Sequence, residues 1–144
     1  MSEIKNLDIT GRCACGAVQF EASGPMRPVI ACHCGTCRRT SGHYWAATQV
    51  YDEDFKVTES RGLKWFDSSD FARRGFCREC GSSLFFKRHG ANRISIAGGA
   101  LDSPTGLTEA EHICTSEAGD YYHIDDTLPS HTDDEISQRF QLPA

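Results

Sequence analysis

The chain has 144 residues, enough for a single domain over residues 1–144 with a modest hydrophobic core. Its net charge of −5 is uneven: residues 1–99 carry 14 Lys and Arg against 10 Asp and Glu, whereas residues 100–144 form an acidic C-terminal tail with 1 Arg against 10 Asp and Glu. The sequence lacks an apolar run of roughly 18 residues, a signal peptide, and a basic stripe interleaved with aromatic residues. We therefore expect a cytoplasmic protein that binds neither membrane nor nucleic acid; nothing in the sequence indicates its oligomeric state.

The predicted elements are mostly short strands separated by turn signals. Residues 1–12 are predicted to be a lead-in. Val18, Phe20 and Ala22 alternate with polar residues and predict a half-buried strand that ends at Ser23–Pro25. Further strands are predicted over 28–31, 44–50, 55–58, 63–66, 83–87 and 93–97, with weaker signals at 112–114 and 121–124; one helical turn is expected over 38–42 and a short helix over Asp133–Phe140. Strands at this spacing predict a mainly β, mostly antiparallel fold with little helix.

The eight cysteines are the strongest chemical signal. Secreted disulfide frameworks are usually smaller and carry an export signal. Cysteines as close as Cys13 and Cys15, or Cys32 and Cys34, do not form relaxed disulfides with each other. Metal ligation is therefore the favoured use of these thiols.

Three thiols lie within the six residues Cys32-His33-Cys34-Gly35-Thr36-Cys37. This spacing allows local turns to bring three sulfurs to about 2.3 Å from one Zn²⁺. The fourth tetrahedral position then belongs to another protein ligand, to water or to a substrate, and its occupant decides between a structural and a catalytic site.

A second pattern is Cys77-x-x-Cys80-Gly81, in which the glycine permits the tight turn that follows the second thiol. The most economical division of seven thiols pairs Cys13 and Cys15 with Cys77 and Cys80 in a closed structural zinc site. The trio of Cys32, Cys34 and Cys37 then forms a second site, so that the chain binds two Zn²⁺. Spacing alone leaves other pairings open.

These cysteines lie in longer runs with a fixed order. The runs are Gly11-x-Cys13-x-Cys15-Gly16-x-Val18-x-Phe20, Cys32-His33-Cys34-x-x-Cys37-Arg38, Arg74-x-Phe76-Cys77-x-x-Cys80-Gly81-Ser82-x-Leu84, Ala97-Gly98-Gly99-Ala100-Leu101-Asp102, His112-Ile113 and Asp126-x-Leu128-Pro129. Together they resemble the glutathione-dependent formaldehyde-activating enzyme family, which includes centromere protein V, over about residues 11–130. The resemblance implies an antiparallel β-tent fold, with a structural zinc on Cys13, Cys15, Cys77 and Cys80 and a catalytic zinc on Cys32, Cys34 and Cys37.

By the same resemblance, the expected function is that of a zinc-dependent carbon–sulfur lyase or synthase. Its substrates would be glutathione, or a similar thiol, and formaldehyde or another small aldehyde. Arg38 and Arg39 are candidates for binding the carboxylates of the thiol substrate. The alternatives are a non-catalytic β-tent module that binds a protein or polymer partner, and a zinc or redox buffer that uses the labile trio.

Two positions depart from the family pattern. Gly119-Asp120-Tyr121-Tyr122 stands where the family commonly has a Pro-Trp pair, and Cys114 stands where an aromatic or aliphatic residue is more usual. Cys114 is expected to be a small buried hydrophobe. His33, which lies between two ligands, is expected mainly to pack or to face solvent rather than to bind the metal.

Overall fold

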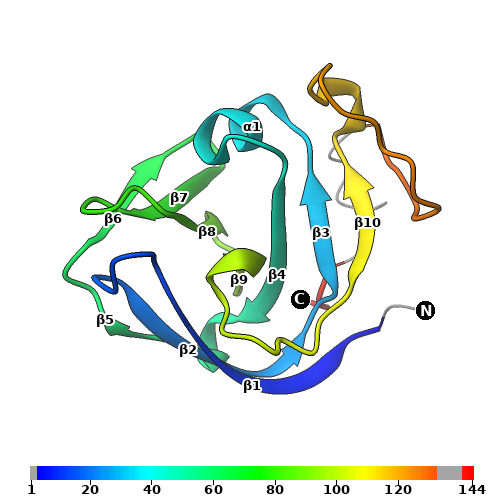
Figure 1. Ribbon diagram of the computed structural model, residues 1–144. Coiled ribbons are helices and arrows are strands. Elements are labelled where there is room, and N and C mark those ends of the chain that lie inside the picture. Colours follow the sequence, from blue (N-terminus) through cyan, green and yellow to red (C-terminus); the bar gives the residue numbers. More distant parts are fainter. Residues whose placement is uncertain (1–2, 133–140) are drawn as a thin grey trace.

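The computed structural model describes residues 3–132 and 141–144, and Figure 1 gives the element labels. The prediction of a mainly β fold with little helix is confirmed. The ten strands of the described residues are β1 (Lys5–Arg12), β2 (Gln19–Met26), β3 (Val29–Cys32), β4 (Trp45–Tyr51), β5 (Phe55–Glu59), β6 (Leu63–Asp67), β7 (Ala72–Cys77), β8 (Ser83–Arg88), β9 (Arg93–Ala97) and β10 (Glu109–Ile113). The helix α1 spans Gly35–Ser41, and three 3₁₀ turns, η1, η2 and η3, span Asp52–Asp54, Gly98–Ala100 and Thr115–Glu117.

The strands form two sheets that enclose one main core. The small sheet has the order β1-β2-β5, and the large sheet has the order β10-β3-β4-β9-β8-β7-β6. In Figure 1 the small sheet lies below the large one. Phe20 of β2 meets Phe85 of β8 edge to face at 5.3 Å between ring centroids, and Phe55 of β5 meets Phe85 at 5.1 Å. Aromatic contacts of this geometry add to the free energy gained from burial, and they hold the two sheets together.

Two strands were missed in the sequence. The lead-in is β1, which pairs antiparallel with β2 along its whole length, although only Ile9 and Gly11 of its residues are buried. The buried positions of the strand β7 hold Ala72, Arg74, Gly75 and Cys77 rather than large apolar side chains, so hydrophobic alternation does not reveal it.

One predicted strand boundary and one predicted strand were also wrong. β2 continues through Pro25, because β5 pairs only with Gln19–Ala22 and leaves that edge of β2 open where a proline is tolerated. Residues 121–124 form no strand, whereas β10 is present and pairs parallel with β3. The helix predicted over Asp133–Phe140 lies outside the described residues.

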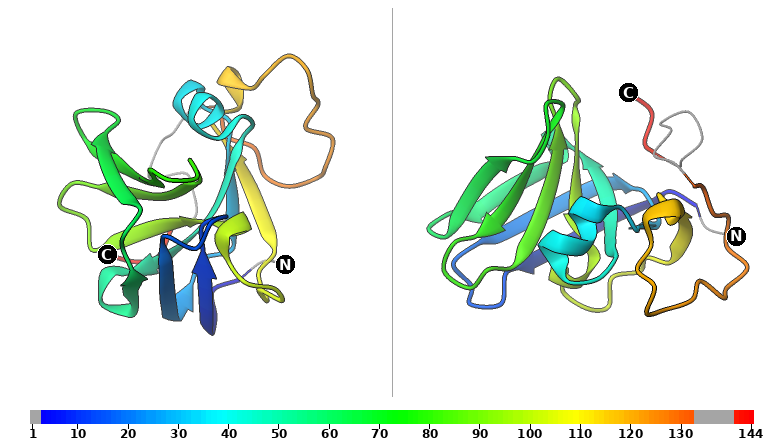
Figure 2. Two further views of the ribbon diagram at one scale, coloured as in Figure 1. Left: turned by 60° about the vertical axis from the view of Figure 1, so that its left-hand side comes forward. Right: turned by 90° about the horizontal axis from the view of Figure 1, so that it is seen from above.

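The arrangement that matters for the site is the junction of β3, α1 and β10. β3 ends at Cys32, and its partner in the register with β10 is Ile113. The segment after β10 therefore starts beside the cysteine-rich run, and Figure 2 shows it on the same side of the molecule as α1. Among the described residues, no helix has the length and apolar character needed to cross a bilayer.

Candidate metal centres

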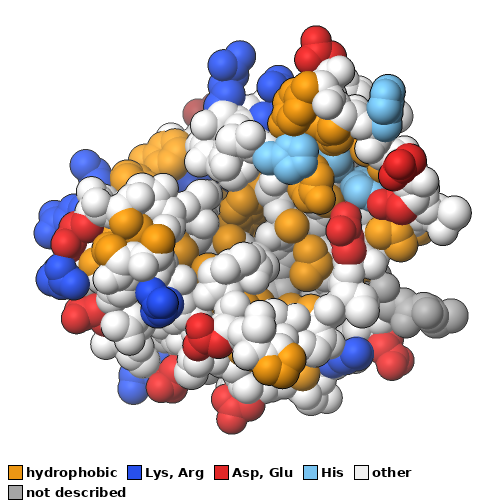
Figure 3. Space-filling view, in the orientation of Figure 1, with side chains coloured by type: hydrophobic (Ala, Val, Ile, Leu, Met, Phe, Trp, Pro, Cys, Tyr) orange, Lys and Arg blue, Asp and Glu red, His pale blue; other side chains and the backbone are white. Residues whose placement is uncertain are grey.

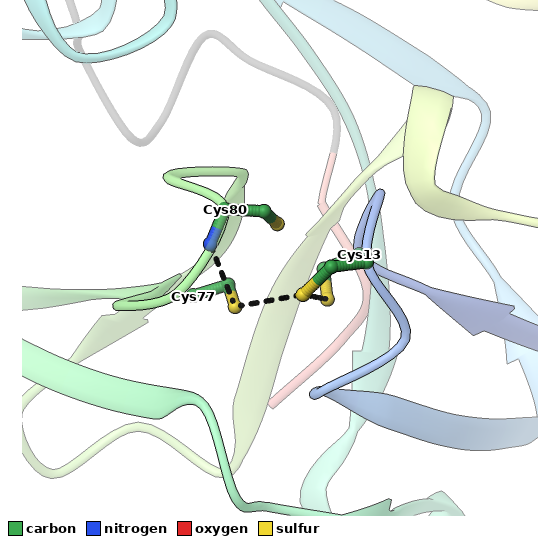
Figure 4. Close-up of side chains that lie close together, drawn as sticks. Cys13, Cys77 and Cys80 are labelled. Atoms are coloured by element: carbon green, nitrogen blue, oxygen red, sulfur yellow. Dashed lines mark hydrogen bonds between the residues drawn. The ribbon is translucent and has the colours of Figure 1, made fainter.

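The sulfur atoms of Cys13, Cys15, Cys77 and Cys80 form one cluster, in which every pair lies within 4.8 Å. The distance from Cys15 Sγ is 3.7 Å both to Cys13 Sγ and to Cys77 Sγ. Two sulfurs at about 2.3 Å from a tetrahedral ion are about 3.8 Å apart. The donor set therefore fits zinc in type, number and spacing, and Figure 4 shows the cluster between the turns that carry it.

The fold builds this cluster from two turns of different sheets. Cys13 and Cys15 lie in the turn between β1 and β2, and Cys77 ends β7 just before the turn that carries Cys80. Cys13 and Cys77 are buried, whereas Cys15 and Cys80 are exposed. Backbone N–H groups support the sulfurs: Val18 N donates to Cys13 Sγ at 3.2 Å and Cys80 N to Cys77 Sγ at 3.5 Å. An ion here would join the small sheet to the large one.

Cys32, Cys34 and Cys37 form a second cluster, whose sulfurs also lie within 4.8 Å of one another. Cys34 is the N-cap of α1, and its sulfur accepts a hydrogen bond from the Cys37 N–H at 3.3 Å. Hydrogen bonds from the Cys32 and Cys37 thiols lower the pKa of Cys34 to about 2. The pKa of Cys32 is raised, first by the Cys114 thiol and then by Cys34, and the pKa of Cys37 is raised by Cys32 and Cys34. The three neighbouring thiols thus shift the pKa values of one another in opposite directions. A cation such as Zn²⁺ replaces their protons and binds all three sulfurs.

The two clusters differ in access. All three cysteines of the trio line one pocket with a volume of about 140 Å³, and none of the four other cysteines lines it. Of those four, Cys13 lines a second, wider pocket of about 620 Å³. The rest of the lining of the trio's pocket is aromatic and cationic, with Arg74 over the rings of Trp45 and Phe86 and Arg88 over the ring of Phe71. It includes Trp45, Phe71 and Phe86, together with Arg27, Arg74, Arg88 and Arg93, and Ser68 and Ser69 from the loop between β6 and β7.

Arg74 links the cationic wall to the trio. Its side chain is buried, with the residue only 6% exposed, and its Nη2 donates to Cys37 Sγ at 3.3 Å. The guanidinium carbon lies 5.1 Å from the Phe86 ring centroid and 5.7 Å from that of Trp45. Within the described part of the chain, its Nε and Nη1 atoms have no hydrogen-bond partner. Arg74 therefore places a positive charge with unused donors beside the three thiols.

The two arginines that the sequence suggested as substrate contacts, Arg38 and Arg39, lie outside this pocket. Arg38 donates from Nε to the Glu117 carbonyl oxygen at 3.0 Å, and Arg39 is exposed on α1. Neither lines the pocket. Sequence reasoning missed Arg27, Arg88 and Arg93, since no cysteine is close to them in the chain and only the pairing of strands brings them to the pocket.

A group of histidines and tyrosines lies next to the trio. His33 is fully buried; its Nδ1 lies 2.5 Å from the Tyr122 hydroxyl and its Nε2 lies 2.9 Å from His112 Nδ1. Burial, and after it the neighbouring His112 and His43, lowers the pKa of His33 to about 4, so the ring is neutral at neutral pH. Figure 3 shows histidine side chains gathered beside hydrophobic ones on this part of the surface.

Cys114 follows β10 and is buried as expected, 4% exposed, where it packs against Cys32 and Cys34. It does not belong to the set of three sulfurs that all lie within 4.8 Å of one another. Its backbone adopts a left-handed conformation with φ of 56°, which starts the turn η3.

Comparison with known proteins identifies several proteins that are similar to this chain. The family model described as glutathione-dependent formaldehyde-activating enzyme matches residues 8–117. An uncharacterized lyase of Schizosaccharomyces pombe is 28% identical over 127 residues, which cover 88% of this chain and 92% of that protein. A crystal structure of a Rhodobacter sphaeroides protein shares the fold with a TM-score of 0.57 at 23% identity, covering 69% of this chain and 97% of its own.

The family match includes both cysteine clusters, and the three cysteines of the trio share one pocket that none of the other four lines. On these grounds, the chain belongs to the glutathione-dependent formaldehyde-activating enzyme family.

Proposed function

We propose that the protein is a zinc-dependent carbon–sulfur lyase that acts on the adduct of a thiol, glutathione or a close relative, with formaldehyde or another small aldehyde. Family membership and the relative named as a lyase support a reaction of this class. The observation that carries the proposal for this chain is that Cys32, Cys34 and Cys37 together line one pocket, whose other walls are rich in arginine and aromatic side chains. A metal site that only supports the fold does not need such a pocket.

In the synthetic direction, the thiol sulfur forms a bond to the carbonyl carbon, and the thiol proton ends on the carbonyl oxygen to give a hydroxymethyl thioether. A free thiol has a pKa of about 8.5, so only a small fraction is thiolate at neutral pH. Zinc, when bound by the three cysteines, would keep a fourth position for the substrate sulfur and favour its thiolate form. The residues of the chain then have to orient the substrates and exclude water.

The cationic wall supports a thiol substrate that carries carboxylates. The guanidinium of Arg74 is buried beside Cys37 and retains unused donors, and Arg27 and Arg93 line the same pocket. Guanidinium groups bind carboxylates through paired hydrogen bonds that are stronger than those between neutral groups. We propose these pocket arginines, in place of Arg38 and Arg39, as the contacts for the substrate carboxylates.

The aromatic wall limits the water that reaches the sulfurs. Trp45 is 7% exposed and packs with Cys37 in a cluster that also includes Phe86. Removing water strengthens the electrostatic contacts between the arginines and an anionic substrate, because the local dielectric constant falls. The pocket thus combines reactive sulfurs, a dry wall and a carboxylate-binding wall.

Exchange spectroscopy by NMR on a mixture of glutathione and formaldehyde tests the proposal. The zinc-loaded protein is expected to accelerate exchange between the free aldehyde and its glutathione adduct, in proportion to protein concentration. The same measurement with a thiol that lacks carboxylates should show a weaker acceleration. Exchange at the uncatalysed rate, for every aldehyde tried with zinc-loaded protein, would remove the proposal.

The non-catalytic alternative requires an exposed patch remote from the trio. The large hydrophobic residues exposed among the described ones are Ile4, Phe66, Phe71 and Tyr121. Phe71 lines the pocket itself, and Tyr121 contacts His43 next to the histidine group. These positions do not favour a partner-binding surface over the pocket.

A further inference from the structure

Four side chains form a continuous line of hydrogen bonds from the surface to the cysteine-rich run. Asp126 Oδ2 lies 2.8 Å from His112 Nε2, His112 Nδ1 lies 2.9 Å from His33 Nε2, and His33 Nδ1 lies 2.5 Å from the Tyr122 hydroxyl. His112 is 4% exposed and His33 is fully buried, whereas the Asp126 side chain is 43% exposed. The line therefore runs through the protein interior, and its third member, His33, lies between Cys32 and Cys34 in the chain.

With one proton on each imidazole ring, the carboxylate fixes the direction of every bond in this line. The hydrogen bond from His112 lowers the pKa of Asp126, which is therefore ionised and can only accept. His112 must then donate from Nε2 and accept at Nδ1, so His33 donates from Nε2. The remaining nitrogen of the neutral His33 ring accepts from the Tyr122 hydroxyl. Reversing any one bond would place two donors or two acceptors face to face.

The line bears directly on the trio, because His33 shares its backbone with two of the three cysteines. The His33 N–H also donates to the Ile113 carbonyl oxygen at 3.0 Å, so both its backbone and its ring are fixed to β10 and the segment beyond it. A rotation of the ring would break the bond to His112 and release this constraint. Partners that orient the residues around a metal ligand typically change metal affinity by about 10-fold to 100-fold when they are removed.

We propose that Asp126 and His112 are positioning residues of the three-cysteine site, which act through His33 to hold Cys32 and Cys34 in the geometry that retains zinc. This inference rests on the proposed function, which places zinc there. Tyr122, the last member of the line, lies in the segment where the chain departs from the family pattern. The four-cysteine cluster contains no member of the line.

The first test measures the release of zinc from the purified two-zinc protein to a chromophoric chelator. Wild type should show a fast phase from the trio and a slow phase from the four-cysteine cluster. Asp126→Asn keeps the size of the side chain but adds a donor, so the direction of the line is no longer imposed. We expect the fast phase to accelerate by about 10-fold and the slow phase to stay unchanged.

Two variants control this experiment. Asp125→Asn removes a neighbouring exposed carboxylate and should release zinc as wild type does. Asp126→Glu keeps an acceptor-only group and should restore the wild-type rate to within about twofold. If Asp126→Asn and Asp125→Asn both match wild type in a protein that holds two zinc ions, the positioning proposal is overturned.

The second test does not depend on metal. Long-range ¹H–¹⁵N correlation spectra distinguish the two neutral tautomers of a histidine ring. The proposal expects the proton on Nε2 in both His33 and His112, and a proton on Nδ1 of either ring overturns it. Zinc analysis of the wild type separates the proposed function from the positioning proposal. A protein that holds only one zinc contradicts the proposed function. The tautomers of His33 and His112 still decide whether the line of hydrogen bonds exists as described.

Discussion

The two cysteine clusters present the same donor atoms in different surroundings. The cluster of Cys13, Cys15, Cys77 and Cys80 takes two thiols from each of two turns and supplies all four tetrahedral positions. None of its members lines the pocket of the trio, although Cys13 lines a second, wider pocket. The trio comes from one local run, supplies three positions and opens on a pocket with arginines and aromatic rings. The comparison indicates that the number of sulfurs supplied, together with access, decides whether a site supports the fold or the chemistry.

The groups that contact the sulfurs also differ between the two clusters. Backbone N–H groups support Cys13 and Cys77 in the closed cluster, as expected for fixed ligands in tight turns. In the trio, Cys37 contacts the guanidinium of Arg74, a full positive charge that offsets part of the excess negative charge of three thiolates. The trio also has a backbone contact, from the Cys37 N–H to Cys34 Sγ, so the guanidinium is the feature that distinguishes its surroundings.

The largest effect is expected for Cys77→Ser. Binding of a structural zinc supplies on the order of 10–16 kcal/mol in zinc-finger peptides, as much as the whole stability of a small domain. Losing a buried ligand that joins the two sheets should therefore abolish cooperative unfolding. Circular dichroism with thermal and urea denaturation checks this, and a native unfolding transition in Cys77→Ser would contradict the assignment of the closed cluster.

Cys34→Ser should show the opposite profile. Activity should fall by at least about 100-fold, because the second zinc loses a ligand, while the free energy of unfolding changes by no more than about 1–2 kcal/mol, the range of ordinary single substitutions. The rate of adduct exchange and urea denaturation are measured on the same sample, with Cys114→Ala as the control for a neighbouring thiol. Equal destabilisation by Cys34→Ser and Cys77→Ser would remove the division between the clusters.

A smaller effect is expected for Arg74→Gln, and Arg73→Gln serves as its control. Arg74 is buried beside Cys37, whereas Arg73 lies on the other face of β7 with its guanidinium 4.4 Å from the Trp65 ring centroid. A hydrogen bond to a charged group contributes about 1.5–3 kcal/mol, so Arg74→Gln should lower kcat/KM for glutathione by roughly 10-fold to 100-fold. The loss should be smaller for a thiol without carboxylates. Equal kinetics in the two variants would argue against the cationic wall.

The smallest effects are expected for Arg38→Gln and Arg39→Gln. Neither side chain lines the pocket, and exposed charge contacts contribute about 0–1 kcal/mol. Both variants should stay within about fivefold of wild type in kcat/KM. A loss of kcat/KM as large as that of Arg74→Gln would indicate that Arg38 and Arg39 bind the substrate.

Sequence reasoning identified the cysteine motifs and the mainly β fold class because both depend on local patterns. A Cys-x-Cys or Cys-x-x-Cys spacing brings sulfurs together within a single turn, and the alternation in β2 marks a half-buried strand. β7 was missed because its inward residues are small or, at Arg74, charged.

The pocket and the hydrogen-bond line could not be predicted, because they depend on tertiary pairing. Arg88 and Arg93 flank the turn between β8 and β9, and Arg27 follows β2, so only the order of the sheet brings them to one wall. His33, His112 and Asp126 are separated by long stretches of chain, and the parallel pairing of β3 with β10 places them in contact.

X-ray absorption at the zinc edge tests the central claim most directly. Seven cysteine sulfurs shared between two ions give about 3.5 sulfur ligands per zinc, and the thiol of glutathione should raise this average to about 4. The same spectra of Cys34→Ser should not respond to glutathione. An average of 4 sulfurs before the thiol is added, or an unchanged first shell in saturating glutathione, would contradict an open position on the three-cysteine zinc.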